Sequence, residues 1–173
     1  MAEELAIIGV RGGRLLTTGC EAVLDRLKLG VPAREGRLLD VAEVAYIIFT
    51  EACRVVDDGG GLSLDKLFVK YGRSKYDWIR FAVILDLRER GRRARAGFGE
   101  NDVIYYKGSE RYQVFVIEEN APIPAESLAE WTRMAVMKGY EPIVAVVDAH
   151  GDVTYYSTRV LKVSDLKEVM GSA

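Results

Sequence analysis

Residues 81–91, Phe-Ala-Val-Ile-Leu-Asp-Leu-Arg-Glu-Arg-Gly, decide the fold of this chain. The run combines apolar residues with strong helix formers and ends in glycine. It predicts a helix that is capped by Ser74, continues through this run and stops at Gly91. The residues before the helix are typical of a small, mainly helical unit, whereas those after it are rich in valine, isoleucine and tyrosine. We therefore expect two domains, residues 1–73 and 74–173, which meet where the helix starts.

The N-terminal domain is predicted to be of mixed α/β type. Asp40 and Glu43 have the spacing of a capping box, in which Asp40 accepts a backbone N–H and Glu43 reaches back to the helix start. Glycines and short polar runs separate the other elements. The expected elements are a hairpin of strands 5–10 and 14–17, helices over 19–30, 41–54 and 63–71, and a glycine-rich turn at 57–61.

The C-terminal domain is predicted to be a central mixed sheet flanked by helices, which places the whole chain in the α/β class. Pro122 and Pro124 precede an expected helix over 125–138, and Gly139 follows it. Residues 148–152 have the composition of a hairpin turn. The expected strands are 102–106, 112–118, 143–148 and 153–156.

Charge is unevenly distributed along the chain. The net charge is only -2, so no global field attracts nucleic acid. Residues 65–95, however, hold ten Lys or Arg against four Asp or Glu, an excess of six positive charges. This segment is either a solvated helix face or a surface that faces phosphates. The arginines that we consider for RNA contact in it are Arg88, Arg92, Arg93 and Arg95.

Composition excludes several classes of protein. Hydrophobic residues make up 49% of the chain, which argues against disorder. Cys20 and Cys53 lack the spacing of a zinc site, and we expect them in a reducing, cytoplasmic environment. We expect no signal peptide, since the start is acidic and its apolar run is short. No stretch is long enough to predict a membrane span.

Several motifs together resemble one known family. Each is weak alone, but their order and spacing over roughly residues 35–160 are specific. The motifs are Asp86-Leu87-Arg88-Glu89-Arg90-Gly91, Gly97-Phe98, Asp102-Val103-Ile104-Tyr105-Tyr106, Tyr112-Gln113-Val114, Arg133-Met134-Ala135 and residues 145–156, Ala-Val-Val-Asp-Ala-His-Gly-Asp-Val-Thr-Tyr-Tyr. In this order they resemble the archaeal tRNA-splicing endonucleases, and residues 36–39 and 41–48 fit that family more loosely.

The resemblance implies a metal-independent cleavage of RNA. In that family a tyrosine is the general base, a histidine the general acid and a lysine stabilises charge on the phosphate, which leaves a 2′,3′-cyclic phosphate and a 5′-hydroxyl. The matching positions here are Tyr106, Ser109 and Tyr140. The tyrosine is present, but serine and tyrosine replace the acid and the cation, and Glu141 stands where the family often has a second lysine. Lys107 and Lys138 lie near the altered positions.

We therefore expect a structural, non-catalytic subunit that assembles with a catalytic subunit as a heterotetramer of two chains of each type, acts on precursor tRNA and needs no cofactor. Arg133 matches an arginine that stacks on a flipped base in the family. An arginine on a helix surface without a role in RNA binding explains this residue equally well. Tyr106 is either a remnant of the active site or a packing residue. The alternative function is a stand-alone RNA-binding or interaction module derived from the nuclease fold.

The resemblance also implies how subunits associate. Family members pair along a strand near the C-terminus and insert an acidic loop into a neighbouring subunit. The matching segments are Val153–Val163, which includes Tyr155 and Tyr156, and the loop at Glu118 and Glu119. An edge strand is a pairing template, and the acidic loop would set partner choice.

Other chemistry fits the residues less well. We expect residues 74–173 to form a restriction-endonuclease-like domain. Metal-dependent nucleases of that fold need an acidic residue such as Asp102 and then Glu-x-Lys on the next strand, where this chain has Gln113-Val114-Phe115. Residues 97–99 lack the frame of a phosphate-binding loop. His150, the single histidine, is expected in an exposed turn, so hydrolase chemistry lacks a base. We expect no metal site.

Overall fold

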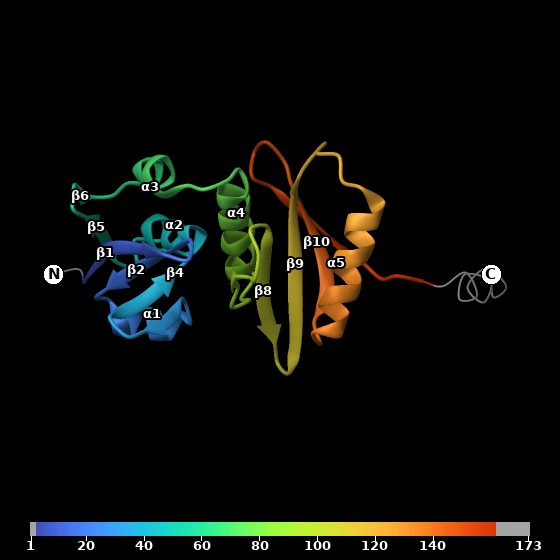
Figure 1. The fold of residues 1–173 in the computed structure, drawn as a ribbon, viewed down its shortest axis with the longest axis horizontal. Coiled ribbons are helices and arrows are strands. Elements are labelled where there is room, and N and C mark those ends of the chain that lie inside the picture. The colour runs from blue at the N-terminus through green and yellow to red at the C-terminus, as the bar shows by residue number, and fades with distance from the viewer. Residues whose placement is uncertain (1–2, 162–173) are drawn as a thin grey trace.

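A computed structural model describes residues 3–161 of the chain. It contains two mixed sheets and five helices. One sheet lies in the N-terminal part and the other in the C-terminal part, and helix α4 (Tyr76–Glu89) stands between them (Figure 1). The α/β class is therefore confirmed. Within residues 3–161, none of the helices combines the length and the apolar character that crossing a bilayer requires.

The N-terminal sheet has six strands in the order β3-β4-β2-β1-β5-β6. Strands β1 and β5 are parallel and the other pairs are antiparallel, and the predicted hairpin of β1 and β2 is confirmed. The strands are β1 (Glu4–Arg11), β2 (Arg14–Thr18), β3 (Val31–Ala33), β4 (Gly36–Leu39), β5 (Arg54–Asp57) and β6 (Gly60–Gly61), and the helices are α1 (Glu21–Leu27), α2 (Val41–Phe49) and α3 (Leu64–Tyr71).

Helix α2 begins as predicted and ends early. The capping box is present: the Ala42 N–H donates to Asp40 Oδ1 at 2.8 Å, and the Asp40 N–H donates to Glu43 Oε2 at 2.9 Å. The helix ends at Phe49, because Glu51 takes a positive φ of 53°. Arg54, predicted as the last residue of the helix, instead starts β5, where pairing with β1 overrides the local helix preference.

Cys20 and Cys53 correct a second expectation. We expected these cysteines in a reducing environment, where disulfides are rare, but the structure joins the two residues in a disulfide with their Cα atoms 6.7 Å apart. Cys20 lies just before α1 and Cys53 just before β5, so the pairing of β1 with β5 helps to bring together residues that are 33 positions apart. Sequence spacing contains no sign of this contact.

The C-terminal sheet has five strands in the order β11-β10-β9-β8-β7. Strands β9 and β10 are parallel, and the other pairs are antiparallel. Helix α4 packs on one face and α5 lies on the other, as Figure 1 shows, so the prediction of a central mixed sheet flanked by helices is confirmed. The remaining elements are β7 (Arg95–Ala96), β8 (Asp102–Lys107), β9 (Glu110–Glu118), α5 (Ala125–Met137), β10 (Glu141–Val147) and β11 (Val153–Ser157).

Helix α4 connects the two halves. It ends as predicted, with Gly91 in the left-handed conformation at φ 79°. Its apolar face packs on the C-terminal sheet. Phe81 packs both against the hydrophobic core of the N-terminal part and against the core between α4 and the C-terminal sheet. The Arg88 guanidinium donates to the backbone oxygens of Ala94 at 2.7 Å and Leu27 at 2.8 Å, which links it to both parts of the chain. The division after residue 73 remains a prediction.

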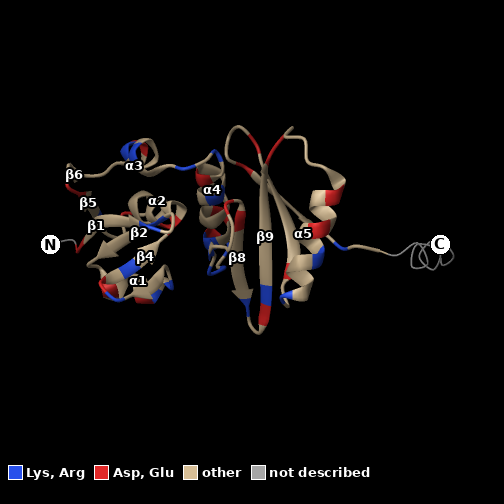
Figure 2. Ribbon diagram, in the orientation of Figure 1, with Lys and Arg blue, Asp and Glu red and all other residues tan. Residues whose placement is uncertain are grey.

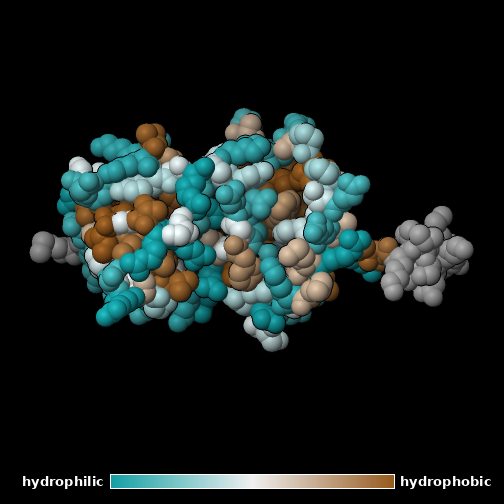
Figure 3. Space-filling model, in the orientation of Figure 1, coloured by the Kyte–Doolittle hydropathy of each residue, from teal (hydrophilic) through white to brown (hydrophobic). Residues whose placement is uncertain are grey.

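Charged and apolar side chains occupy different regions of the surface. Figure 2 shows basic residues on α4 and on the segment that follows it. Figure 3 shows apolar side chains gathered over β1 and β2, where Ile8 and Val10 are 55% and 61% exposed. Exposed apolar patches of this kind mark contact surfaces. The N-terminal sheet thus presents a face suited to association.

Candidate functional site

Tyr106 and Tyr140 meet at one end of the C-terminal sheet. Tyr106 is the next-to-last residue of β8, and Tyr140 directly precedes β10. Tyr140 is buried, whereas Tyr106 is 39% exposed. Arg111, the partner of Tyr106 in the β8–β9 ladder, also lies over the Tyr140 ring, so the two tyrosines are neighbours. The structure therefore brings together two of the three positions that sequence comparison selects, although they lie 34 residues apart in the printed chain.

Basic neighbours change the acidity of this pair. Burial raises the pKa of Tyr106, but the hydrogen bond with Tyr140 and the guanidiniums of Arg95 and Arg111 outweigh it and hold that pKa below its usual value. Burial and the hydrogen bond with Tyr106 raise the pKa of Tyr140. Tyr106 is therefore the more acidic of the two phenols.

Strand pairing places the basic residues beside the tyrosines. Arg111 lies directly opposite Tyr106 in the β8–β9 ladder, and its guanidinium carbon is 5.2 Å from the centre of the Tyr140 ring. Arg95 pairs with Ile104, two residues before Tyr106, so its side chain lies on the same face of the sheet. Gly139 permits this packing, because a Cβ there would lie 2.7 Å from the Arg111 guanidinium.

The loop at residues 97–99 borders the same site and depends on Asp102. The buried Asp102 carboxylate accepts hydrogen bonds from the Phe98 N–H at 3.0 Å, the Gly99 N–H at 2.6 Å and Gln113 Nε2 at 2.8 Å. The Phe98 ring stands edge-on to Tyr140 with centroids 5.6 Å apart. The Asp102 carboxylate thus stabilises the conformation of this loop.

Carboxylates near this end of the sheet lie on its other face. Glu141 pairs with Tyr112 in the β9–β10 ladder, and Glu110 Oε2 accepts a hydrogen bond from the Tyr112 hydroxyl at 2.6 Å. The side-chain hydrogen bond to Glu110 and burial raise the pKa of Tyr112 to about 12, with a smaller contribution from Glu141. Alternation along a strand separates this acidic group from the basic group around Tyr106.

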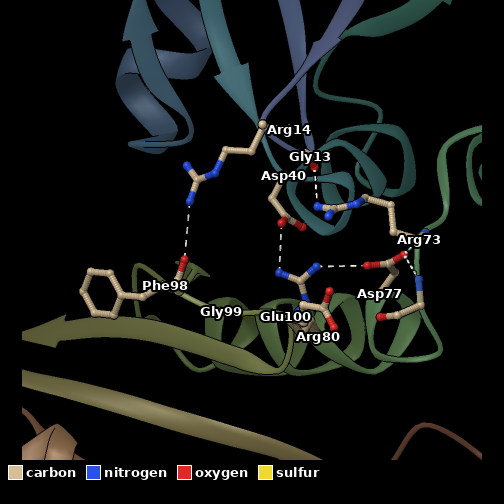
Figure 4. Close-up of a pocket in the computed structure, with 12 residues that line it drawn as sticks. Gly13, Arg14, Asp40, Arg73, Asp77, Arg80, Phe98, Gly99 and Glu100 are labelled. Carbon is tan, nitrogen blue, oxygen red and sulfur yellow. Dashed lines mark hydrogen bonds and ion pairs between the residues drawn. The ribbon is translucent and has the colours of Figure 1, made fainter.

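A second site, a cavity of about 220 Å³, lies between the two parts of the chain (Figure 4). Arg80 crosses its floor: Nη1 donates to Asp40 Oδ2 at 2.9 Å, and Nη2 donates to Asp77 Oδ1 at 3.0 Å. Arg73 donates to the Gly13 oxygen at 2.8 Å, and Arg14 donates to the Gly97 oxygen at 3.4 Å. These contacts fix the N-terminal part against α4 and the 97–99 loop.

Glu43 forms another contact between the two parts. Besides capping α2, its Oε1 accepts a hydrogen bond from the Ala96 N–H at 3.4 Å. Burial raises the pKa of this carboxyl, and the backbone hydrogen bond from Asp40 opposes that shift. The same residue therefore starts a helix in one part and holds β7 in the other.

The other residues singled out for RNA contact are scattered. Ser109 lies on the exposed turn between β8 and β9, at the same end of the sheet as Tyr106. Arg133 is exposed on α5, and Arg93 is also exposed, while Arg92 is half-buried. Arg88 is occupied by backbone oxygens and by stacking on Tyr46, so its guanidinium has an internal role. Arg111 was not predicted as a site residue, although a two-residue turn at Gly108-Ser109 pairs it with Tyr106 across the hairpin.

The residues considered for assembly also differ in their surroundings. Glu118, the last residue of β9, lies 3.6 Å from the Lys75 ammonium, whereas Glu119 is exposed. The Tyr155 hydroxyl donates to Asp86 Oδ2 at 2.6 Å, while Tyr156 is 55% exposed on the edge strand β11. The end of the proposed pairing segment, residues 162–163, lies outside the described residues.

Asp102 and His150 were the residues considered for metal binding and for acid–base catalysis, respectively. Asp102 is occupied by the loop and Gln113, and residues 3–161 contain no group of His, Cys, Asp and Glu side chains arranged to hold a metal ion. His150 lies in the exposed turn before β11, as predicted. It is therefore placed as a surface residue in the hairpin between β10 and β11.

Comparison with known proteins identifies the family. Residues 78–155 match the model of the tRNA intron endonuclease catalytic C-terminal domain. The tRNA-splicing endonuclease of Thermococcus onnurineus is 31% identical over 72% of this chain and 76% of its own length. The enzyme of Thermococcus kodakarensis is 31% identical over 74% of this chain and 80% of its own length. The enzyme of Pyrococcus horikoshii is 30% identical over 72% of this chain and 76% of its own length. With this similarity spanning both halves of the fold, the chain belongs to the tRNA-splicing endonuclease family.

Proposed function

We propose that this chain is a structural, non-catalytic subunit of a tRNA-splicing endonuclease, which cleaves precursor tRNA in a heterotetramer with a catalytic subunit. One observation carries the proposal: Tyr106 and Tyr140 meet where the family's base and cation are expected, yet the second position holds a buried phenol. The domain thus supports the architecture of an active site without its full set of groups.

The chemistry of cleavage explains why these residues are insufficient. Tyr106 can still act as a base, because its lowered pKa makes the phenolate more accessible. The leaving 5′-oxygen needs a proton donor, and a serine hydroxyl at position 109 is far too weak an acid near neutral pH. At position 140 the side chain is a buried phenol, which carries no positive charge to stabilise the phosphate. Tyr106 could therefore serve as the base, but position 109 provides no general acid on the other side of the phosphate to protonate the leaving oxygen.

Surface features support an assembly role. The apolar patch over β1 and β2 and the edge strand β11 both offer contact surfaces, and Tyr156 is exposed on that edge. A cytoplasmic location also remains part of this proposal. The second candidate, a stand-alone RNA-binding module, is favoured by the basic residues around Tyr106 and predicts RNA binding without assembly.

Mixing the chain with a catalytic homologue from the same organism tests the proposal. We expect the chain alone to leave precursor tRNA intact, because the acid and the cation are missing. The mixture should form a complex of two chains of each type and cut at the intron boundaries, giving 2′,3′-cyclic phosphate ends in the presence of chelator. Light scattering measures the mass, and end-group analysis measures the products. Specific cleavage by this chain alone, or a mixture that never associates, would contradict the proposal.

Neutralising the acidic loop should weaken that complex. Glu118→Gln with Glu119→Gln removes the charge that we propose docks in the partner, and we expect about a tenfold weaker association at low salt. Glu119 should account for most of the effect, since Glu118 already lies near Lys75. The matched control, Glu126→Gln with Glu130→Gln, changes two exposed carboxylates on α5. Equal affinities of the two double variants in analytical ultracentrifugation would reject the loop's role.

A further inference from the structure

Three cations gather around the Tyr106–Tyr140 pair. Arg95 and Arg111 lie on the same face of the sheet as Tyr106, because Arg95 pairs with Ile104 and Arg111 pairs with Tyr106, two residues further along β8. Lys138 directly follows α5 as its C-cap, and its ammonium lies 5.1 Å from the centre of the Phe98 ring. In Figure 2 the turn between β8 and β9 and the end of α5 lie at the same end of the domain. The cluster therefore draws on three separate segments of the chain.

No carboxylate neutralises these cations among residues 3–161. The salt bridges and side-chain hydrogen bonds to Asp and Glu within that part of the chain involve other basic residues, such as Arg80, Arg37 and Lys70. The nearby acids Glu110 and Glu141 lie on the opposite face with Tyr112. The Arg95 Nε atom is buried and makes no hydrogen bond within the described chain. An unmatched group of cations with an unsatisfied buried donor is the arrangement that receives an anion.

An aromatic ring borders the cations. Phe98 is 59% exposed, although the Asp102 carboxylate holds its backbone in place. Tyr140 supports the ring from the side, and Lys138 lies over it, so its orientation is set by contacts on two sides. An exposed, fixed ring next to cations offers a stacking surface for a base whose phosphate the cations hold.

We propose that Arg95, Arg111 and Lys138 bind a phosphodiester of single-stranded RNA, and that Phe98 stacks on a base next to it. The choice of RNA as the ligand rests on the proposed function and deepens it, since this chain would grip the substrate at a site where it does not cut. Arginine guanidiniums suit this task, because their planar donors match phosphate oxygens in pairs. Both tyrosines lie beside Arg111.

Binding of a labelled, short single-stranded RNA to the full chain tests the proposal by fluorescence anisotropy at several salt concentrations. Arg95→Gln with Arg111→Gln should weaken binding about tenfold or more and lower the slope of log affinity against log salt by about one to two. The matched control is Arg26→Gln with Arg34→Gln, which removes the same charge from exposed positions in the N-terminal part and should change affinity less than about threefold.

Two further variants separate charge from folding and stacking. Arg95→Lys with Arg111→Lys keeps the charge and should restore most of the affinity and the salt slope. Phe98→Ala should weaken RNA binding about tenfold but leave the binding of inorganic phosphate, followed by NMR of the tyrosine rings, unchanged. Circular dichroism melting curves confirm that each variant folds.

The outcomes distinguish this site from the subunit role. RNA affinity that is equal in the Arg95/Arg111 double variant and the control overturns the site, even where the mixed complex assembles and cleaves. Binding of inorganic phosphate without binding of RNA also overturns it, because the cations then hold a free anion only. A salt-dependent loss in the double variant supports the site, even where no assembly with a catalytic homologue occurs and the subunit role fails.

Discussion

Arg80→Met should lower the free energy of unfolding by about 3–5 kcal/mol. Arg80 is 3% exposed and donates to both Asp40 and Asp77, which are themselves buried. Without the guanidinium, two buried carboxylates lose their common counter-ion. Asp40 also caps α2, and Asp77 accepts the backbone N–H groups of the segment that leads into α4. Urea denaturation followed by circular dichroism measures the change.

The control for this prediction comes from the same cavity. Arg73 lines it as well, but it is exposed and its guanidinium reaches only the Gly13 oxygen among the contacts described. Arg73→Met should therefore cost less than about 1 kcal/mol. Arg80→Lys should fall between the two, since an ammonium keeps the charge but not the two-pronged geometry. Similar stability of Arg80→Met and Arg73→Met would show that this buried network contributes little.

Local sequence signals predicted the five helices and the hairpin of β1 and β2, but not strands β3, β4, β5 and β6 of the N-terminal sheet. Gly91 ends α4, Ser63 caps α3 by accepting the Lys66 N–H, and the capping box starts α2. These signals act over a few residues, so they survive whatever the rest of the chain does. Segments rich in valine, isoleucine and tyrosine likewise predicted β8, β9, β10 and β11, whereas the two-residue strand β7 was not expected.

Contacts between distant residues are where sequence reasoning failed. The disulfide joins positions 33 apart, and Arg80 reaches Asp40 across 40 positions. Arg111 becomes part of the candidate site only because the register of β8 and β9 pairs it with Tyr106. A register error of one residue in β9 would place the Arg111 side chain on the other face of the sheet. Such contacts depend on how whole elements dock, and no periodic pattern in a single sequence records that docking.

The surroundings of positions 109 and 140 determine whether substitutions there could restore cleavage. Ser109→His with Tyr140→Lys would supply the two absent groups beside Tyr106, whose lowered pKa already favours its role as base. A lysine at 140 would escape Glu141, which lies with Tyr112 on the other face, but it would meet Arg111, whose guanidinium now lies over the ring at that position. Like charges raise the cost of that lysine and lower its pKa.

We expect the doubly substituted chain to make correctly placed but slow cuts in a complex whose catalytic partner carries a disabled active site. Restoring a positioned acid is worth about 10²–10⁴-fold, yet residue 109 sits on an exposed two-residue turn, whereas a catalytic group must be held within about 0.5 Å of productive geometry. The rate should therefore exceed that of the Tyr140→Lys single variant and remain well below that of an intact catalytic subunit. Single-turnover cleavage of precursor tRNA with chelator present measures this order. Cuts at other positions, or equal rates for the single and double variants, would mean that residue 109 does not face the phosphate that Tyr106 and residue 140 flank.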